Sequence, residues 1–250
     1  QIYCNKITRM YKIIIFMYMS KIAIILGSGL TKFKNEITNS NIAYTEIGGI
    51  HEKQVIEGKI GNKNIVLFTG RNHFYETYSK EKVFRNISIA KDMNVDFLIV
   101  TNAAGGLNPN FQISDLMLIK SHINFFQIPL VKKNAFHFDS DLLKWAKNSA
   151  IKNRLKVHEG NYYASFGPVY ETQSEINFIR KAGADSVGMS TIPDILMAND
   201  LGIRTLGISC ITNMLYYGVN LHVSHDEVVS AGNKAYKLFS NYLKILINDY

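Results

Sequence analysis

The chain has 250 residues, of which 47% are apolar and 19% are charged. This balance excludes intrinsic disorder as the main state, and the counts of 17 Gly and 4 Pro exclude a collagen-like or low-complexity chain. The net charge of +8 comes from basic residues that are interleaved with acids along most of the chain, so a nucleic-acid partner is not expected. The two cysteines form no CxxC motif and no disulfide framework, which indicates a reducing compartment and no structural zinc.

Residues 13–19 form a short apolar run that follows several basic residues, an arrangement similar to a signal peptide. The run is too short to span a bilayer, no small-residue cleavage site follows it, and Lys21 leads directly into a strand-like segment. We therefore interpret residues 1–18 as a non-native or disordered extension with Met19 as the start, and residues 19–250 as one domain. No membrane association is expected.

Short apolar runs alternate with longer amphipathic segments along the rest of the chain, a pattern typical of an α/β domain. The expected strands are 22–26, 65–69, 97–101, 116–119, 161–164 and 205–210. The expected helices are 82–93, 141–154, 174–182, 192–201 and 227–247. No repeat, linker or low-complexity tract interrupts them, so a single domain is the simplest interpretation.

Polar and glycine-rich segments follow three of the expected strands, at residues 27–29, 70–73 and 102–106. Ligands of mostly parallel sheets bind at the carboxyl ends of the strands. These segments carry Gly, Ser, Arg and His side chains, so we expect them to converge on one site.

The segment Gly27-Ser28-Gly29 can bring backbone and hydroxyl groups close to an anion, or it can be a plain tight turn. It lacks the third glycine of a dinucleotide fingerprint and the Gly-Lys-Ser/Thr of a P-loop.

The segment 69–76 carries three side chains suited to anion chemistry. Arg71 can bind phosphate in a bidentate manner, and His73 shares a face with it in an extended segment. Glu76 can orient the imidazole of His73. The alternative is a surface ion pair between Arg71 and Glu76.

Three further segments have both a functional and a structural interpretation. Residues 101–108 either expose backbone N–H groups to a ligand or form a close-packed turn between a strand and a helix. Tyr170 can stack on a base beside the carboxylate of Glu171, while Thr172 and the residue three positions later form a capping box for the next helix. Asn213 suits a ring nitrogen and an exocyclic oxygen, or marks a turn.

Two other chemistries are not expected. His222 and His225, with the acids that follow them, lack metal-ligand spacing, so no metal is expected. A hydrolase pair of Ser28 and His73 lacks the G-x-S-x-G elbow.

Taken together, the chain from about residue 21 to its C-terminus resembles the trimeric purine nucleoside phosphorylase family. The resemblance is carried, in this order, by GSGL (27–30), GRNHFYE (70–76), TNAAGGLN (101–108), GPVYET (167–172), VGMST (187–191) and ITN (211–213). It implies an α/β domain with a central mixed sheet flanked by helices, and a cytoplasmic homotrimer with sites near the subunit interfaces. It also implies reversible phosphorolysis, in which a purine nucleoside and phosphate give the free base and ribose 1-phosphate. Phosphate is then a co-substrate, and no cofactor is expected.

The resemblance assigns roles residue by residue. Phosphate binding falls to Ser28, Arg71, His73, the backbone N–H of Ala103, and Ser190. Purine binding falls to Tyr170, Glu171 and Asn213, and ribose binding to Tyr75, Met189 and His225. Asn213, Glu171 and His73 are the expected catalytic residues, with Glu76 orienting His73. His51 corresponds to a phosphate-loop histidine, and Phe136 to an aromatic residue lent across the trimer interface.

Several positions depart from the family pattern. Thr77 replaces a glycine, Asp194 replaces a glutamate, Tyr170 is larger than the usual phenylalanine, and the segment 130–141 is short. These departures bear on the interface contact and on base preference. Asn213 with Glu171 favours 6-oxopurine nucleosides such as inosine and guanosine over methylthioadenosine, and xanthosine remains an open alternative. A nucleotide-binding module without catalysis is the competing class, and the combination of Arg71, His73, Glu171 and Asn213 speaks against it.

Overall fold

The computed structural model describes residues 21–46, 53–126, 138–215 and 225–250. The strands are β1 (Lys21–Ile25), β2 (Thr38–Glu46), β3 (Lys53–Ile60), β4 (Lys63–Phe68), β5 (Phe97–Gly106), β6 (Leu116–Asn124), β7 (Val157–Ala164), β8 (Ser186–Gly188) and β9 (Arg204–Met214). The helices are the 3-10 helix η1 (Thr31–Glu36), α2 (Phe74–Thr77), α3 (Lys80–Val83), α4 (Arg85–Asp92), α5 (Ser140–Lys152), α6 (Gln173–Lys181), α7 (Ile192–Asp200) and α8 (His225–Asp249).

The strands form one mixed sheet in the order β2-β3-β4-β1-β5-β8-β7-β6-β9. β1 lies parallel to both β4 and β5, whereas β3 is antiparallel to β2 and β4. β9 also pairs in parallel with β5, so β5, β8, β7, β6 and β9 form a closed ring of strand pairings. The ring brings the ends of β8 and β9 beside the last residues of β5.

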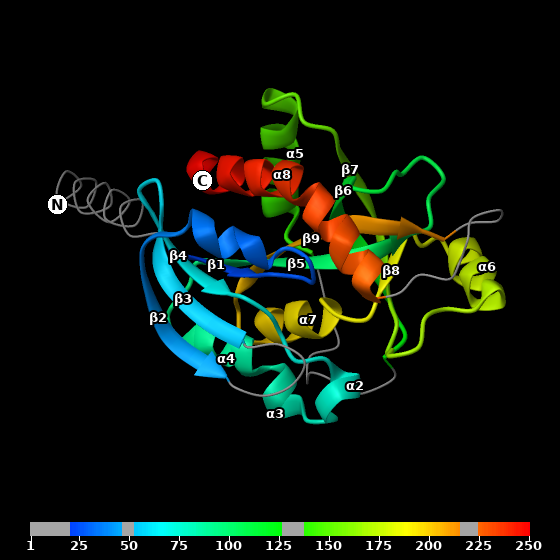
Figure 1. The fold of residues 1–250 in the computed structure, drawn as a ribbon, viewed down its shortest axis with the longest axis horizontal. Coiled ribbons are helices and arrows are strands. Elements are labelled where there is room, and N and C mark those ends of the chain that lie inside the picture. Colours follow the sequence, from blue (N-terminus) through cyan, green and yellow to red (C-terminus); the bar gives the residue numbers. More distant parts are fainter. Residues whose placement is uncertain (1–20, 47–52, 127–137, 216–224) are drawn as a thin grey trace, which may run out of the picture.

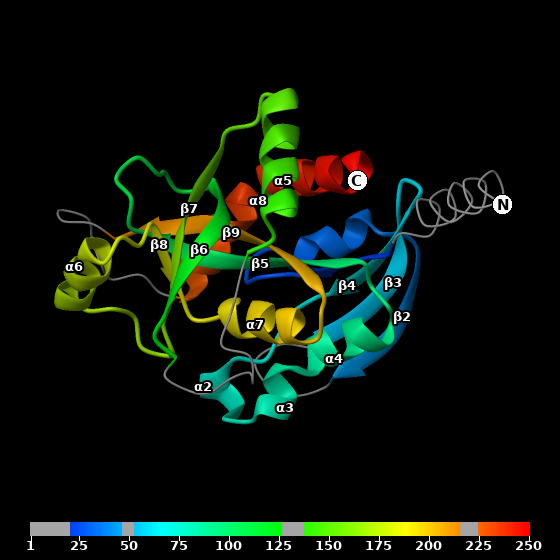
Figure 2. The same cartoon turned by 180° about the vertical axis from the view of Figure 1, so that it is seen from behind.

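Helices cover both faces of the sheet (Figure 1). Alternate residues of β1 show this directly, because Ile22 and Ile24 pack with α5 and α8 while Ala23 and Ile25 pack with α4 and α7. A strand that is buried on both faces is a continuous apolar run, as the sequence of β1 is. The view from behind shows the same two helical layers (Figure 2), and the expected fold class is confirmed.

The predicted elements match the structure best where they are buried. All six predicted strands and the helices over α5, α6, α7 and α8 are present, with shifted ends. The predicted helix 82–93 is broken at Phe84, whose ring packs edge-on against Phe74. The prediction that residues 102–106 form a loop after the third strand is wrong, because β5 continues to Gly106. The strands β2, β3 and β8 are not predicted from the sequence.

The interpretation of residues 1–18 as an extension concerns residues outside the described ones, so it stays a prediction. Within the described ranges, every helix is too short or too polar to cross a bilayer.

Candidate active site

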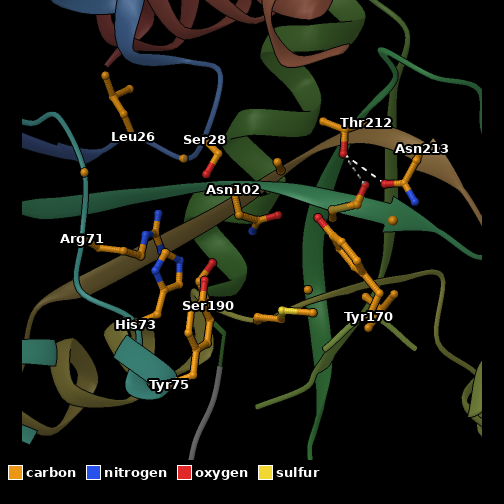
Figure 3. Close-up of a pocket in the computed structure, with 18 of the residues that line it drawn as sticks. Leu26, Ser28, Arg71, His73, Tyr75, Asn102, Tyr170, Ser190, Thr212 and Asn213 are labelled. Carbon is orange, nitrogen blue, oxygen red and sulfur yellow. Dashed lines mark hydrogen bonds between the residues drawn. The ribbon is translucent and has the colours of Figure 1, made fainter. Parts of the chain in front are cut away.

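A cavity of about 250 Å³ lies where β1, β4, β8 and β9 end, beside the last residues of β5 (Figure 3). Its size is close to the low end of small-molecule sites, which begin at roughly 300 Å³. Ten of the residues that the sequence singles out line it: Ser28, Arg71, His73, Tyr75, Ala103, Tyr170, Glu171, Met189, Ser190 and Asn213. Figure 3 shows Arg71 and His73 at one end of the cavity and Asn213 and Tyr170 at the other. We refer to these as the Arg71 end and the Asn213 end.

The guanidinium of Arg71 is buried and held by groups from distant parts of the chain. Nη1 donates to Asp194 Oδ2 over 2.7 Å, and Nη2 donates to the backbone carbonyl of Thr101. Burial raises the pKa of the Asp194 carboxyl, and the positive charge of Arg71 opposes that shift. The alternative in which Arg71 pairs with Glu76 is therefore wrong, because its carboxylate partner is Asp194 in α7.

Thr191 connects Arg71, Asn102 and Ser190 through its hydroxyl. Its Oγ1 accepts from Asn102 Nδ2 at 2.9 Å and from Arg71 Nη1 at 3.3 Å, and lies 3.3 Å from Ser190 Oγ. The backbone of Thr191 has φ 74° and ψ −56°, and Ile192 N donates to Ser190 O over 2.8 Å. This is a classic γ-turn, which is rare and strained for a β-branched residue. The surrounding contacts must stabilise that turn, and they fix Ser190 at the cavity wall.

His73 is the N-cap of α2 and is oriented by Glu76. Nδ1 of His73 lies 2.8 Å from Glu76 Oε1, and the backbone N–H of His73 donates to Glu76 Oε2 over 3.3 Å. Burial raises the pKa of the Glu76 carboxyl, but the hydrogen bonds from His73 and nearby positive charges outweigh it, and the pKa is lowered. An ionised carboxylate only accepts, so Nδ1 carries the proton and Nε2 is left for a ligand.

Glu171 provides the carboxylate at the Asn213 end. It immediately precedes α6, whose capping box of Thr172 and Glu175 is present as predicted. Ser165 Oγ donates to Glu171 Oε1 over 2.9 Å, and burial raises the pKa of the Glu171 carboxyl. The start of α6 thus fixes the position of the Glu171 carboxylate, a partly buried hydrogen-bond acceptor in the cavity.

Asn213 lies within β9, so the alternative of a turn at this position is wrong. Thr212 Oγ1 donates to Asn213 Oδ1 at 3.2 Å and also lies 3.4 Å from the carbonyl of Ala104 (Figure 3). Thr212 thus holds the amide through its oxygen, an orientation that leaves the NH₂ group to serve as a donor on the other side of the amide.

Tyr75 and Met189 line the space between the ends. The ring of Tyr75 stacks on His73 with centroids 4.9 Å apart, and burial, with smaller contributions from Glu76 and Tyr170, raises the pKa of its hydroxyl to about 12. Gly167 lies so close that a Cβ there would be 2.6 Å from the sulfur of Met189. Asn102 also lines this space, and its Oδ1 is buried with no hydrogen-bond partner among the described residues.

Some predicted residues cannot be placed. His225 begins α8, but its side chain is not described, and His51 and Phe136 lie outside the described residues. Sequence reasoning assigned no role to Thr212, Thr191, Asn102 or Lys53, which all contact or line the cavity. The contacts of Thr191 and Lys53 join segments far apart in the chain, so no local spacing reveals them. Thr212 contacts its neighbour Asn213, but nothing in the sequence marks that hydroxyl as its partner. Across the described ranges, no cluster of three His, Cys, Asp or Glu side chains is arranged to hold a metal ion.

Comparison with known proteins identifies the family to which the chain belongs. Residues 21–248 match the model of the phosphorylase superfamily. The chain is 38% identical to purine nucleoside phosphorylase 1 of Bacillus subtilis, with 92% of each chain covered. It is 35% identical to the purine nucleoside phosphorylase of Rattus norvegicus, covering 92% of this chain and 89% of that one.

Solved structures give the same result. A Schistosoma mansoni purine nucleoside phosphorylase in complex with adenosine superposes with a TM-score of 0.82 at 30% identity, covering 99% of this chain and 97% of that one. A structure of the Schistosoma mansoni enzyme with inosine has a TM-score of 0.81 at 31% identity, covering 92% and 90%. The chain belongs to the phosphorylase superfamily. The enzyme class that the sequence predicts, a purine nucleoside phosphorylase of the pentosyltransferase type, is confirmed.

Proposed function

We propose that this enzyme catalyses the reversible phosphorolysis of 6-oxopurine ribonucleosides and deoxyribonucleosides, such as inosine and guanosine, in purine salvage. The products are the free base and the corresponding (deoxy)ribose 1-phosphate. The observation that carries the proposal is the division of one cavity into an Arg71 end with guanidinium and imidazole groups and an Asn213 end with an amide donor and a carboxylate.

The Arg71 end holds the phosphate in this proposal. Cleavage of a glycosidic bond develops positive charge on the sugar, and a phosphate fixed beneath the sugar stabilises that charge and then captures the anomeric carbon. Ser28, Ser190 and the backbone N–H of Ala103 complete the set of donors around Arg71 and His73. No enzyme nucleophile, metal or cofactor takes part.

The Asn213 end stabilises the leaving base. The bond electrons move onto the purine as it leaves, so negative charge develops at N7 and O6, where the NH₂ group of Asn213 donates. Glu171 accepts from N1–H, and Tyr170 packs on the ring. A 6-amino group would place a donor against the donor of Asn213, so discrimination against adenosine and methylthioadenosine is expected.

The sugar occupies the space between the ends. Tyr75 and Met189 line it, and we assign His225 to the 5′ end of the ribose as the resemblance implies.

We also propose a homotrimer in the cytoplasm. Large apolar side chains are exposed near the Asn213 end, including Val169, Phe125 and Phe178. Phe125 stacks on Tyr163, whose pKa is raised by burial and then by the charge of the nearby Glu171. Such a patch beside the site supports a subunit contact there. The low cysteine content supports a reducing compartment.

The test is a parallel assay of inosine, adenosine, methylthioadenosine and xanthosine, each with and without inorganic phosphate. We expect hypoxanthine from inosine only when phosphate is present, and adenosine to be cleaved at least tenfold less efficiently. Preferred cleavage of methylthioadenosine or adenosine would overturn the base assignment, and preferred cleavage of xanthosine would identify the alternative substrate. Phosphate binding without turnover of any nucleoside would favour a non-catalytic module.

A further inference from the structure

Lys53 is a lysine that the structure turns inward. It is the first residue of β3, and its side chain is only 14% exposed. A lysine ammonium that is largely withdrawn from water needs polar or charged partners. Lys53 is among the residues that line the cavity.

The partners of Lys53 lie at the Arg71 end. Its Nζ donates to Asn72 Oδ1 and lies 3.7 Å from Glu76 Oε2. The other carboxylate oxygen of Glu76 is the one that contacts His73 Nδ1 at 2.8 Å. Glu76 is therefore shared between an ammonium group on one side and the imidazole on the other.

The Arg71 end contains two carboxylates, and their negative charge must be balanced if this end is to bind an anion. The positive charge of Arg71 is matched at 2.7 Å by the buried carboxylate of Asp194. Glu76 adds a second carboxylate, directly behind the imidazole that faces the cavity. Without Lys53, these groups would present one guanidinium and two carboxylates to an incoming anion, and the Coulomb repulsion would act in a partly buried site where screening is weak.

We propose that Lys53 is a positioning residue for phosphate: it offsets the charge of Glu76, so that His73 can be held by a carboxylate without making the Arg71 end repel an anion. The proposal rests on the phosphorolysis described above. It predicts an effect confined to the anionic substrate, because the Asn213 end shares none of these contacts.

The first test replaces Lys53 by an uncharged side chain of similar length, Lys53→Met. We expect the KM for phosphate to rise about tenfold, a change of about 1.4 kcal/mol, while the KM for inosine stays within twofold and kcat falls less than the phosphate KM rises. Lys53→Arg should restore the phosphate KM to within threefold of wild type. The matched control is Lys59→Met on the same strand, which removes the same charge from an exposed position and should leave the phosphate KM unchanged.

The second test asks whether Lys53 acts through Glu76. In the double variant Lys53→Met/Glu76→Gln no carboxylate remains to be offset, so its phosphate KM should be lower than that of Lys53→Met alone. A double variant no better than Lys53→Met overturns the proposal, as does a Lys53→Met enzyme whose phosphate and inosine KM values rise together. If wild type shows no phosphate-dependent cleavage, the proposed function fails. If wild type is active and Lys53→Met keeps its phosphate KM, only the inference about Lys53 fails.

Discussion

Arg71 places a full positive charge in the interior of the domain, with 6% of its surface exposed. Its carboxylate partner Asp194 lies 123 residues further along the chain and is itself 2% exposed. Removing one member of a buried ion pair leaves the other without compensation for its lost hydration. The stability of the fold and the orientation of this guanidinium are thus coupled.

We expect Asp194→Asn to lower the free energy of unfolding by about 3 kcal/mol. Urea denaturation at neutral pH measures this loss. The control is Asp92→Asn at the exposed end of α4, which should change stability by less than about 0.5 kcal/mol. If the two variants lose equal stability, the pair with Arg71 is not a determinant of stability.

Thr212 acts on the base through the amide of Asn213. Its hydroxyl lies 3.2 Å from Asn213 Oδ1, and no other described side chain is recorded as bonded to that amide oxygen. We expect Thr212→Val to reduce kcat/KM for inosine about tenfold, because the amide loses the contact that directs its NH₂ group into the cavity. The KM for phosphate should not change.

Steady-state kinetics with inosine and adenosine checks this expectation, and Thr212→Ser, which keeps the hydroxyl, serves as the control. The ratio of inosine to adenosine efficiency should fall in Thr212→Val and be preserved in Thr212→Ser. A Thr212→Val enzyme with an unaltered ratio of inosine to adenosine efficiency would show that Asn213 is oriented by other contacts.

The sequence predicts those side-chain contacts that are local. The pairs His73–Glu76 and Thr172–Glu175 are each three residues apart and are both formed. The partners of Arg71, Thr191 and Lys53 were not predictable, because they come from other strands and helices. Local spacing therefore identifies the residues of a site more readily than the contacts that orient them.

At the scale of elements, the small residues at the end of β5 show why a glycine-rich segment can be mistaken for a loop. A Cβ at Gly105 would lie 2.5 Å from Leu215 Cδ1, and one at Gly106 would lie 2.7 Å from Met214 Sδ. The glycines are needed because side chains pack over this strand, and no turn is involved. A run of small residues is typical of loops and of such crowded strands alike, so the sequence alone did not separate them.

The missed strands have a different physical cause. β2 lies at one edge of the sheet and has no buried residue, so its sequence shows no apolar period. β3 contains both Lys53 and Glu57, which interrupt its apolar residues. By contrast, β1, β4 and β9 are buried for most of their length and were predicted within a few residues, apart from the last four residues of β9.

Asp139 joins two elements, the start of α5 and the start of β9. Its Oδ1 accepts from the backbone N–H groups of Asp141 and Leu142 at 3.1 and 2.9 Å, which caps the helix. Arg204 donates to both carboxylate oxygens, over 2.6 and 3.0 Å. The hydrogen bond from Arg204 is the largest cause of the lowered pKa of Asp139, and the caps lower it further against the effect of burial.

We expect Asp139→Ala to reduce the free energy of unfolding by about 1 kcal/mol at pH 7, and Asp139→Asn, which keeps a capping oxygen, to lose less. The folded-state pKa of Asp139 lies below its unfolded value of about 3.9, so its stabilisation is complete above that pH and is lost as the pH falls through the folded-state pKa. Denaturation curves between pH 8 and pH 4 should show a constant difference between wild type and Asp139→Ala that begins to narrow near pH 4. A difference that grows on acidification would contradict this sign.

At the scale of the whole molecule, α6 lies on the opposite side from the edge strand β2 (Figure 1), and the segment just before α6 lines the cavity. Two exposed aromatic side chains meet at α6. Phe178 in α6 is 55% exposed and meets the ring of Phe125 edge-on at 6.2 Å. Exposed aromatic rings in contact with each other are costly in a monomer, and a subunit contact would bury them.

We expect Phe178→Glu to convert the proposed trimer into monomers, because it places a charge in the apolar centre of the contact. Sedimentation velocity measures this as a change from three times 28.3 kDa to 28.3 kDa. The matched control is Ile151→Glu, which adds the same charge at a 65% exposed apolar position on α5, away from the cavity, and should remain trimeric. Because the proposed sites lie near subunit interfaces, the monomer should also lose inosine cleavage while keeping its thermal stability within a few degrees. A wild-type chain that sediments as an active monomer, or a Phe178→Glu chain that stays trimeric, would remove the argument that the aromatic patch is a subunit contact.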